Sequence, residues 1–277
     1  MNEVNHFSVH FWGVRGSVAC PGSENARYGG NTSCIEIRCG EQMLVFDAGT
    51  GMRNLAKKLQ TRKNLNLDLF LTHTHFDHVC GFPFFGPAFK PETRLKIWAG
   101  HLLPEHNIRE VLEDMMKEPL WPVQLEHMSG NIKFHDFTAG DVLTPKDEIV
   151  VRTGLLNHAS RATGYRIEYH GQSVCYITDT EHFPDKLDGN IVELIRNSDL
   201  FIYDCTYTDE EYPNHLDWGH STWQEGVKLA NEGNVKTFVV FHHNPDHDDH
   251  VMDTIAAEVS DARPGSVIAK EGMTLCL

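Results

Sequence analysis

The sequence predicts a globular fold of the α/β class, in which strands form sheets and helices cover the sheet faces. Strand-like and helix-like segments alternate through both halves of the 277-residue chain, the pattern of layered α/β folds. Apolar residues make up 40% of the sequence, which is enough for a sizeable core. No Ser- or Pro-rich linker and no repeat interrupts the chain, so we expect a single domain over residues 1–277.

The first half begins with an alternating strand at residues 6–12 and a long glycine-rich loop at residues 13–31. Such a loop is either functional or a plain connector. A hairpin over residues 32–47 is expected to turn at Gly40-Glu41. Pro104 stands at the start of a predicted helix, where proline is tolerated. The further elements expected here are helices at residues 52–60 and 104–117 and strands at residues 95–99, 132–137 and 148–153.

The second half repeats this alternation. A strand is expected to end at Asn157-His158, and a hairpin to turn at His170-Gly171. A Ser or Thr cap is available at the start of the helix near residue 221. The remaining expected elements are strands at residues 163–169, 173–178, 200–204 and 235–241 and helices at residues 186–197, 221–231 and 249–260.

The strongest functional signal follows the apolar run Leu69-Phe70-Leu71, which reads as a buried strand. Within six residues come His73, His75, Asp77 and His78, and all four side chains can ligate a divalent metal. A strand that ends in a polar loop aims these side chains into the crevice outside its carboxyl end. A solvated, histidine-rich loop is the alternative, but four potential ligands in this spacing favour a metal site.

The spacing resembles the His-x-His-x-Asp-His signature of the metallo-β-lactamase superfamily. The other pieces that this resemblance requires follow in order, each at or just after a strand-like run: Asp47, His158, Asp179 and His242. The resemblance therefore covers most of the chain. It implies a four-layer αβ/βα sandwich of two packed sheets, the metallo-β-lactamase fold, with the metals at one edge.

The resemblance also implies roles for these residues. Asp179 would bridge two divalent ions, and Asp47 would support the ligand loops without binding metal. The first ion would be held by His73, His75 and His158, and the second by Asp77, His78 and His242. Zn²⁺ suits these ligands, and Mn²⁺ or Fe is compatible. Two such ions can share a hydroxide that acts as the nucleophile, so no Ser or Cys nucleophile is needed.

Later motifs narrow the resemblance to one branch. Many β-lactamases of this fold carry Cys where this chain has Asp179. Tyr203-Asp204-Cys205-Thr206 and Gly219-His220-Ser221-Thr222 resemble the RNase Z and phosphodiesterase branch. In RNase Z the first motif reads His-Glu-Ala-Thr, so Tyr203 replaces a His used near the scissile phosphate. His220 and His243 remain as candidate proton donors beside the catalytic Asp77, and His243 is slightly favoured because it adjoins a ligand.

Several residues near these motifs have two interpretations. Phe82, Phe84 and Phe85 could stack on a substrate, although core packing is favoured. Cys80 lies close to the ligand loop and is either a further metal ligand or a packing residue, whereas Cys175 reads as core.

The charged residues of the later loops are interpreted from their surroundings. His247 and His250 lie in an acidic run and are predicted to be solvated. Arg15, Arg27 and Arg161 lie in loops that could reach a substrate.

The composition of the chain limits the kinds of partner that the protein could bind and the compartment in which it is expected. The formal charge of −15 comes from 39 acidic and 24 basic residues, which makes binding to long nucleic acid an unfavourable interpretation. Seven Cys without a Cys-x-x-Cys pair indicate a reducing compartment rather than a disulfide framework. The N-terminal residues lack the features of a signal peptide, and no apolar run approaches the roughly 20 residues of a membrane span. We therefore expect a cytoplasmic protein without membrane attachment.

These observations lead to a ranked set of functions. The first is a dinuclear metal-dependent phosphodiesterase that cleaves a small nucleotide, cyclic forms included. The alternatives are a lactone or thioester hydrolase with the same nucleophile, an RNase Z-like nuclease, and a metal-binding sensor without activity. The full ligand set argues against the sensor. The expected partner is a small-molecule phosphodiester, and a homodimer is compatible with the sequence.

Overall fold

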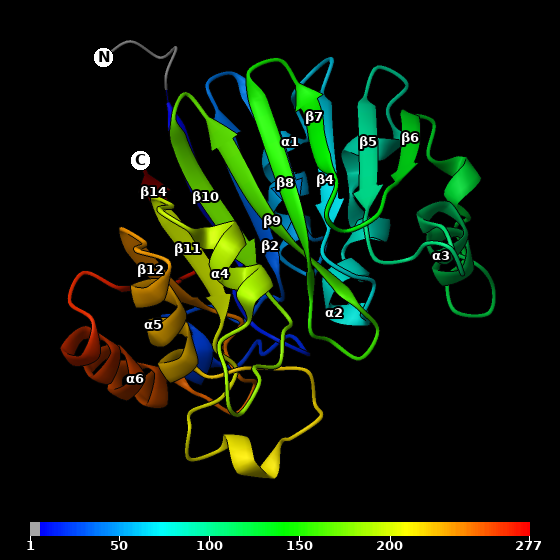
Figure 1. Cartoon of the computed structure of the whole chain (residues 1–277). Coiled ribbons are helices and arrows are strands. Elements are labelled where there is room, and N and C mark those ends of the chain that lie inside the picture. The colour runs from blue at the N-terminus through cyan, green and yellow to red at the C-terminus, as the bar shows by residue number, and fades with distance from the viewer. Residues whose placement is uncertain (1–5) are drawn as a thin grey trace.

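Two sheets face each other and carry helices on their outer faces, as Figure 1 shows. The computed structural model describes residues 6–277. Residues 1–5, where the prediction about a signal peptide partly falls, lie outside the described residues. The four-layer sandwich implied by the sequence is confirmed.

Each sheet of residues 6–277 has seven strands, and each combines antiparallel with parallel pairing. The first has the order β14-β1-β2-β3-β4-β5-β6, and the second the order β13-β12-β11-β10-β9-β8-β7. The strands of the first sheet are β1 (Phe7–Gly13), β2 (Cys34–Cys39), β3 (Gln42–Phe46), β4 (Asn66–Leu71), β5 (Arg94–Ala99), β6 (Asn131–Asp136) and β14 (Thr274–Cys276). Those of the second are β7 (Val142–Lys146), β8 (Ile149–Leu156), β9 (Ala162–Tyr169), β10 (Gln172–Ile177), β11 (Leu200–Asp204), β12 (Thr237–Phe241) and β13 (Val267–Ile268).

The helices cover the two outer faces. They are α1 (Met52–Leu59), α2 (Phe76–Val79), α3 (Ile108–Met115), α4 (Gly189–Ile195), α5 (Trp223–Glu232) and α6 (Asp249–Ala262). Short 3-10 turns occur at η2 (Ser23–Asn25), η3 (Phe82–Phe84), η4 (Gly86–Phe89), η5 (Leu125–His127) and η6 (Tyr212–Asn214). None of the helices in residues 6–277 is both long enough and apolar enough to cross a bilayer.

The central core lies between the sheets and is rich in aromatic rings. Phe46 stacks on Phe70 at 5.1 Å and meets the edge of Tyr165 at 5.2 Å, which joins the first sheet to the second. Burying each such side chain contributes roughly 2 kcal/mol. Two outer cores lie between the sheets and their helices, one around Leu55 of α1 and one around Leu229 of α5. The interface between the sheets is therefore rigid, and the loops at its edge are held on both sides.

Two helices begin later than the sequence predicts, because local caps decide where they start. The helix expected at residues 104–117 starts at Ile108, since the Asn107 side chain accepts the Glu110 N–H. The helix expected at residues 186–197 starts at Gly189, since Asp188 caps it in the same way. The short strands β7, β13 and β14 lie at sheet edges and were missed, because their sequences alternate weakly.

Parallel pairing brings the ends of several strands to one edge. β4 runs parallel to β3, and β12 runs parallel to β11 and through it to β10. The loops that follow β4, β8, β10 and β12 lie together at the lower end of the view in Figure 1. This edge holds the candidate site.

Backbone strain marks the same edge. Asp47, Asp179 and His242 each lie within two residues of a strand end and have φ of 59°, 60° and 61°. Non-glycine residues rarely occupy this left-handed region, which costs on the order of 1–2 kcal/mol each. Strain retained at three neighbouring strand ends indicates a functional constraint there.

Candidate metal centre

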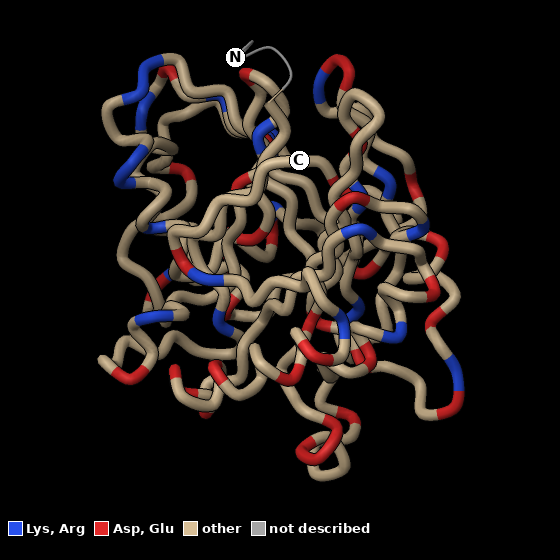
Figure 2. The backbone as a smooth tube through the Cα atoms, turned by 90° about the vertical axis from the view of Figure 1, so that its left-hand side faces the viewer, with Lys and Arg blue, Asp and Glu red and all other residues tan. Residues whose placement is uncertain are grey.

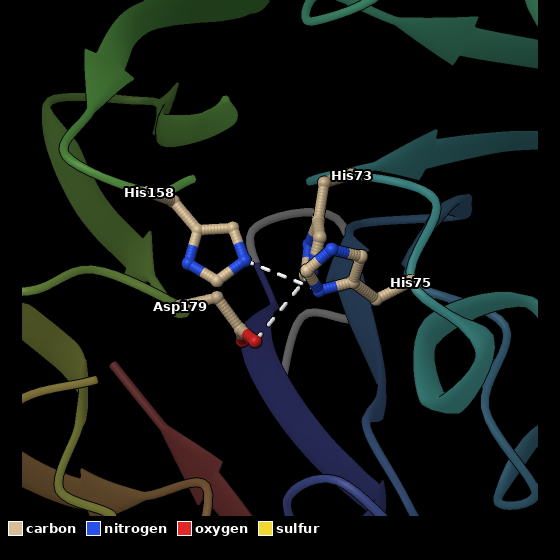
Figure 3. A group of neighbouring side chains, drawn as sticks. All are labelled: His73, His75, His158 and Asp179. Carbon is tan, nitrogen blue, oxygen red and sulfur yellow. Dashed lines mark hydrogen bonds and ion pairs between the residues drawn. The ribbon is translucent and has the colours of Figure 1, made fainter. Parts of the chain in front are cut away.

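Two groups of potential ligands meet at this edge. The first comprises His73, His75, His158 and Asp179, and the second comprises Asp77, His78, Asp179 and His242. Within each group the ligand atoms all lie within 4.8 Å of one another, and Figure 3 shows the first group. The structure thus brings together all seven ligands expected from the sequence, in the two expected groups, with Asp179 common to both.

Hydrogen bonds fix which ring nitrogen three of the imidazoles present. The Nδ1–H of His158 donates to the carbonyl of Gly219 at 3.0 Å, and the Nδ1–H of His78 donates to Asp47 at 2.9 Å. His242 Nδ1 lies 3.0 Å from the hydroxyl of Thr206, which itself donates to a carboxylate. These three rings therefore turn Nε2 toward the centre, as metal-ligating imidazoles do.

Asp47 supports the centre from behind. It is fully buried, and its Oδ1 accepts the backbone N–H of Thr72 at 2.8 Å. Its Oδ2 accepts from His78 and, at 2.9 Å, from the hydroxyl of Tyr176. Asp47 belongs to neither ligand group, so its position agrees with the supporting role that the resemblance implied.

The donor set fits divalent cations. The Nε2 atoms of His73, His78 and His242 are buried and have no hydrogen-bond partner. All three face Asp179, at distances of 3.5, 3.1 and 3.2 Å from its carboxylate oxygens. Buried polar atoms are normally satisfied, so three unpaired nitrogens around one buried carboxylate indicate a cation site.

Electrostatics favour the metal-binding form at two of the ligands, whereas Asp179 and Asp77 outweigh burial and raise the pKa of a third, His78. Burial and the neighbouring His78 lower the pKa of His73 well below its usual value. Burial alone would raise the pKa of Asp179, but His242, His78 and His73 outweigh it and hold this pKa below its usual range. Ionised carboxylate and neutral imidazole are the forms that bind metal.

Comparison with known proteins decides the family. A family model described as "Beta-lactamase superfamily domain" matches residues 42–243. The chain belongs to the β-lactamase superfamily. The match spans the strand before Asp47 through His243, and so includes every residue of both ligand groups.

This superfamily member is similar to proteins with different names. Ribonuclease Z of Treponema pallidum (strain Nichols) is 22% identical over 283 residues, covering 87% of this chain and 89% of the relative. YhfI of Bacillus subtilis, a metallo-β-lactamase fold protein, superposes with a TM-score of 0.72 at 19% identity, covering 99% of this chain and all of YhfI. A diphosphatase of the PhnP family superposes with a TM-score of 0.69 at 16% identity, covering 98% and 97% of the two chains. These structural similarities establish the fold alone.

A third polar group adjoins the ligands of this superfamily member. His220 Nδ1 lies 3.0 Å from Asp204 Oδ2, and the His220 ring stacks on His242 at 5.0 Å. Burial would lower the pKa of His220, but Asp204 outweighs burial and raises the pKa to about 9. The sequence predicted His220 as a candidate donor but did not pair it with Asp204. The two neighbouring motifs that contain these residues were the available signal.

The prediction that His243 is the proton donor is wrong. The side chain is fully buried, and its Nε2–H donates to the carbonyl of Ala269 at 2.9 Å. Burial and the neighbouring Arg15 lower the pKa of His243 to about 3. A neutral, enclosed ring committed to the backbone has no proton to give a substrate.

Two loop predictions also need correction. His247 is buried and lies 2.7 Å from Glu211, so it is not solvated, whereas His250 is exposed as expected. Arg15 is fully buried and donates to the carbonyls of Asn244 and His247, so it cannot reach a substrate.

The first loop has a structural role that the sequence did not reveal. Arg15 holds this loop against the segment after His242. The Ser17 N–H donates to Asp77 Oδ2 at 2.9 Å, and a Cβ at Gly16 would lie 2.5 Å from the His242 ring. The loop therefore fixes Asp77 and His242 of the second group. Its close approach to the His242 ring explains why residue 16 is Gly16.

The remaining residues are placed as follows. Phe82 and Phe85 are buried in the core beside α1, as favoured, whereas Phe84 is 52% exposed and contacts Trp121. Cys175 is buried in the outer core of the second sheet, and Cys80 joins neither ligand group. Arg27 is held away from the centre by Asp253 at 2.7 Å.

We predict close to two equivalents of divalent metal per chain. The two ligand groups share only Asp179, so Asp77→Ala and His242→Ala should each lose about one equivalent. Elemental analysis of protein purified without chelator measures this. A wild-type value near one that neither substitution changes would contradict a dinuclear centre.

Proposed function

We propose that the protein is a metal-dependent hydrolase that cleaves a small phosphodiester, with a nucleotide as the preferred substrate. The observation that carries this proposal is the Asp204–His220 pair, in which His220 Nδ1 lies 3.9 Å from Asp179 Oδ2. A phosphodiester with an alkyl leaving group needs a proton on the departing oxygen, and a positioned imidazole supplies one.

Different residues of the chain bind the metal ions and donate the proton in the proposed reaction. The seven ligands would hold two divalent ions, which when bound lower the pKa of coordinated water and neutralise charge on a phosphoryl oxygen. His220 keeps its Nδ1–H on Asp204, so its Nε2 is the nitrogen that can give a proton. Nε2 has no hydrogen-bond partner within residues 6–277, and the side chain is 11% exposed.

Asp204 is itself held in place. Its Oδ1 accepts the hydroxyl of Thr206 at 2.6 Å, and its Oδ2 accepts the N–H of Thr180 at 3.2 Å. The carboxylate therefore orients His220 without rearrangement, in the way that a second acidic residue orients a catalytic histidine elsewhere. We assign His220 the donor role and Asp204 a positioning role.

A panel of chromogenic esters tests the reaction class. Metal-reconstituted protein should hydrolyse bis-p-nitrophenyl phosphate faster than simple lactones and thioesters. Both classes could use the same nucleophile, but only the diester needs the two-ion clamp on its phosphoryl oxygens. Turnover of lactones or thioesters without turnover of the diester would replace this proposal with the carbonyl hydrolase.

RNase Z activity is the second candidate, because curated relatives of similar length carry that name. Two features oppose it. Tyr203 occupies the position of the RNase Z histidine, and its hydroxyl donates to Ser221 in the protein interior. The loops at the lower end of Figure 2, the end that holds the ligand groups, are mainly acidic, which opposes the approach of a tRNA to the site.

The expected preference is for small diesters over a tRNA precursor. The kcat/KM for a cyclic mononucleotide should exceed that for the precursor and should depend weakly on salt. Each phosphate contacted by Lys or Arg would add a slope of about −0.7 to −0.9 in log affinity against log salt. Steady-state kinetics at several salt concentrations measure this. Efficient, strongly salt-dependent cleavage of the precursor, with no turnover of small diesters, would restore the RNase Z assignment.

A further inference from the structure

Two cavities open on either side of the metal ligand His158. One, of about 460 Å³, is lined by Arg161 and Lys186, and the other, of about 490 Å³, is lined by Glu181 and Asp217. Both also include Asn157, His158 and Phe183, so these residues form a shared wall. A substrate whose phosphodiester meets the metal ligands can place its other parts in these cavities, because both adjoin His158.

The first cavity offers positive charge that the protein pairs only in part. The Lys186 ammonium lies 4.8 Å from the centre of the Phe183 ring and makes no salt bridge within residues 6–277. Arg161 donates only through Nη1, to the carbonyl of Leu103 and at 3.5 Å to the exposed Glu105. The remaining guanidinium donors of Arg161 are free to bind an anion in the planar geometry that suits phosphate.

The acidic residue of this cavity is committed elsewhere. Asp188 Oδ1 accepts the backbone N–H groups of Asn190 and Ile191 at the start of α4. Asp188 keeps its charge, but Arg161 and Lys186 together outnumber it, so the lining of the first cavity has a small excess of positive charge, although the whole chain carries −15.

Arg161 also has an unusual backbone. Its φ is 59°, in the left-handed region that bulky residues rarely occupy. Its N–H donates to the carbonyl of His158 at 2.9 Å, which closes a tight turn behind that ligand. The turn fixes the start of the Arg161 side chain relative to the metal ligands, and such strain is typical of functional positions.

The second cavity excludes anions. Glu181 accepts the N–H groups of Asp217 and Gly219 at 2.8 and 2.9 Å, which holds its charge in place. Asp217 adds a second carboxylate, and no Lys or Arg of the described residues lines this cavity. An uncharged substituent suits this side, whereas a phosphate would be repelled.

We propose that Arg161 and Lys186 form a subsite for a second phosphate. The substrate is then a nucleotide that carries a phosphate monoester in addition to the diester cleaved at the ligand groups. This inference rests on the proposed phosphodiesterase activity. It also gives the substrate a direction, with the phosphate-bearing nucleoside on the Arg161 side of His158 and the other substituent of the diester on the Glu181 side.

Two matched probes test the subsite. They are thymidine 5′-(p-nitrophenyl phosphate) and the same compound with a 3′-phosphate. Wild-type protein should show a kcat/KM about three- to tenfold higher for the phosphorylated probe, the range expected for exposed ion pairs with a dianion. In the double variant R161Q/K186Q this ratio should fall to about one. Lys186→Arg should restore most of it, and Lys63→Gln, at an exposed lysine elsewhere, should leave the ratio unchanged.

Calorimetry separates this inference from the proposed activity. Thymidine 3′,5′-bisphosphate should bind more tightly than thymidine 5′-monophosphate, and the double variant should lose the difference. If neither probe is cleaved but this difference is present and lost in the variant, the activity is wrong and the subsite stands. If the parent probe is cleaved but the 3′-phosphate improves neither kcat/KM nor binding, the subsite is wrong. If the double variant loses kcat/KM equally on both probes, Arg161 and Lys186 support His158 rather than bind a phosphate. That result would also overturn the subsite.

Discussion

Replacing Asp179 with Asn is expected to remove metal from both ligand groups and to lower kcat/KM by on the order of 10³-fold or more. Asp179 is common to the two groups, and its oxygens lie 3.1–3.5 Å from three unpaired Nε2 atoms. The amide keeps the shape of the side chain and tolerates the φ of 60° at this position. The substitution therefore removes the bridging charge with little change in the backbone, and losses of this size follow when a central electrostatic group is removed.

Metal content and thermal stability check this result independently of activity. Zn²⁺ should raise the Tm of wild-type protein, because a ligand that binds only the folded state stabilises it. The Asp179→Asn variant should lose this increase. Asp261→Asn, at an exposed position of α6, should keep both the metal and the Tm increase. An Asp179→Asn variant with wild-type metal content and rate would show that Asp179 does not bridge.

His158→Ala should change the metal content differently from Asp179→Asn. His158 belongs only to the first group, so the variant should keep about one equivalent of metal in the second group. It should still lose most activity if both ions are needed for the diester. Loss of both equivalents would indicate that the second group depends on the first for its geometry.

The sequence predicted the ligand groups because they depend on local pattern and strand order. His73, His75, Asp77 and His78 are contiguous, so one strand end places them together. Asp179 follows a strand of the other sheet, and parallel strands bring such ends to one edge of a sandwich. The contiguous motif could therefore locate the site from the residues alone, whereas the later ligands and the two groups came from the resemblance to the metallo-β-lactamase superfamily.

The errors concern which way a side chain faces. His242 and His243 are neighbours, but they turn to opposite sides after the end of β12, so only one reaches the metal centre. His242 turns toward Asp179, and His243 turns into the interior against Ala269. Burial of Arg15 and His247 depends on the loops that pack over them, and those contacts join residues more than 200 positions apart. A single sequence does not contain this information.

His220→Ala is expected to lower the rate on an alkyl phosphodiester by about 10²–10⁴-fold, the usual value of general-acid help. The loss on a p-nitrophenyl diester should be small. Nitrophenolate leaves without a proton, whereas an alkoxide must be protonated as the bond breaks. Asp204→Asn should show the same dependence on the leaving group with a smaller loss, because it disturbs the orientation of His220 but keeps the ring. Steady-state kinetics on the two esters, with metal content held equal, measure the difference.

His250→Ala is the matched control, since His250 is exposed and its side chain makes no hydrogen bond in the described part of the chain. It should leave both rates unchanged. The test depends on the ratio of the two losses, because a residue that merely supports the ligands would slow both esters alike. The His220 ring stacks on His242, so support of the ligands is the main alternative to proton donation. Equal losses on both esters, or a fall in metal content, would show that His220 supports the metal ligands. The proposed proton donor would then be wrong.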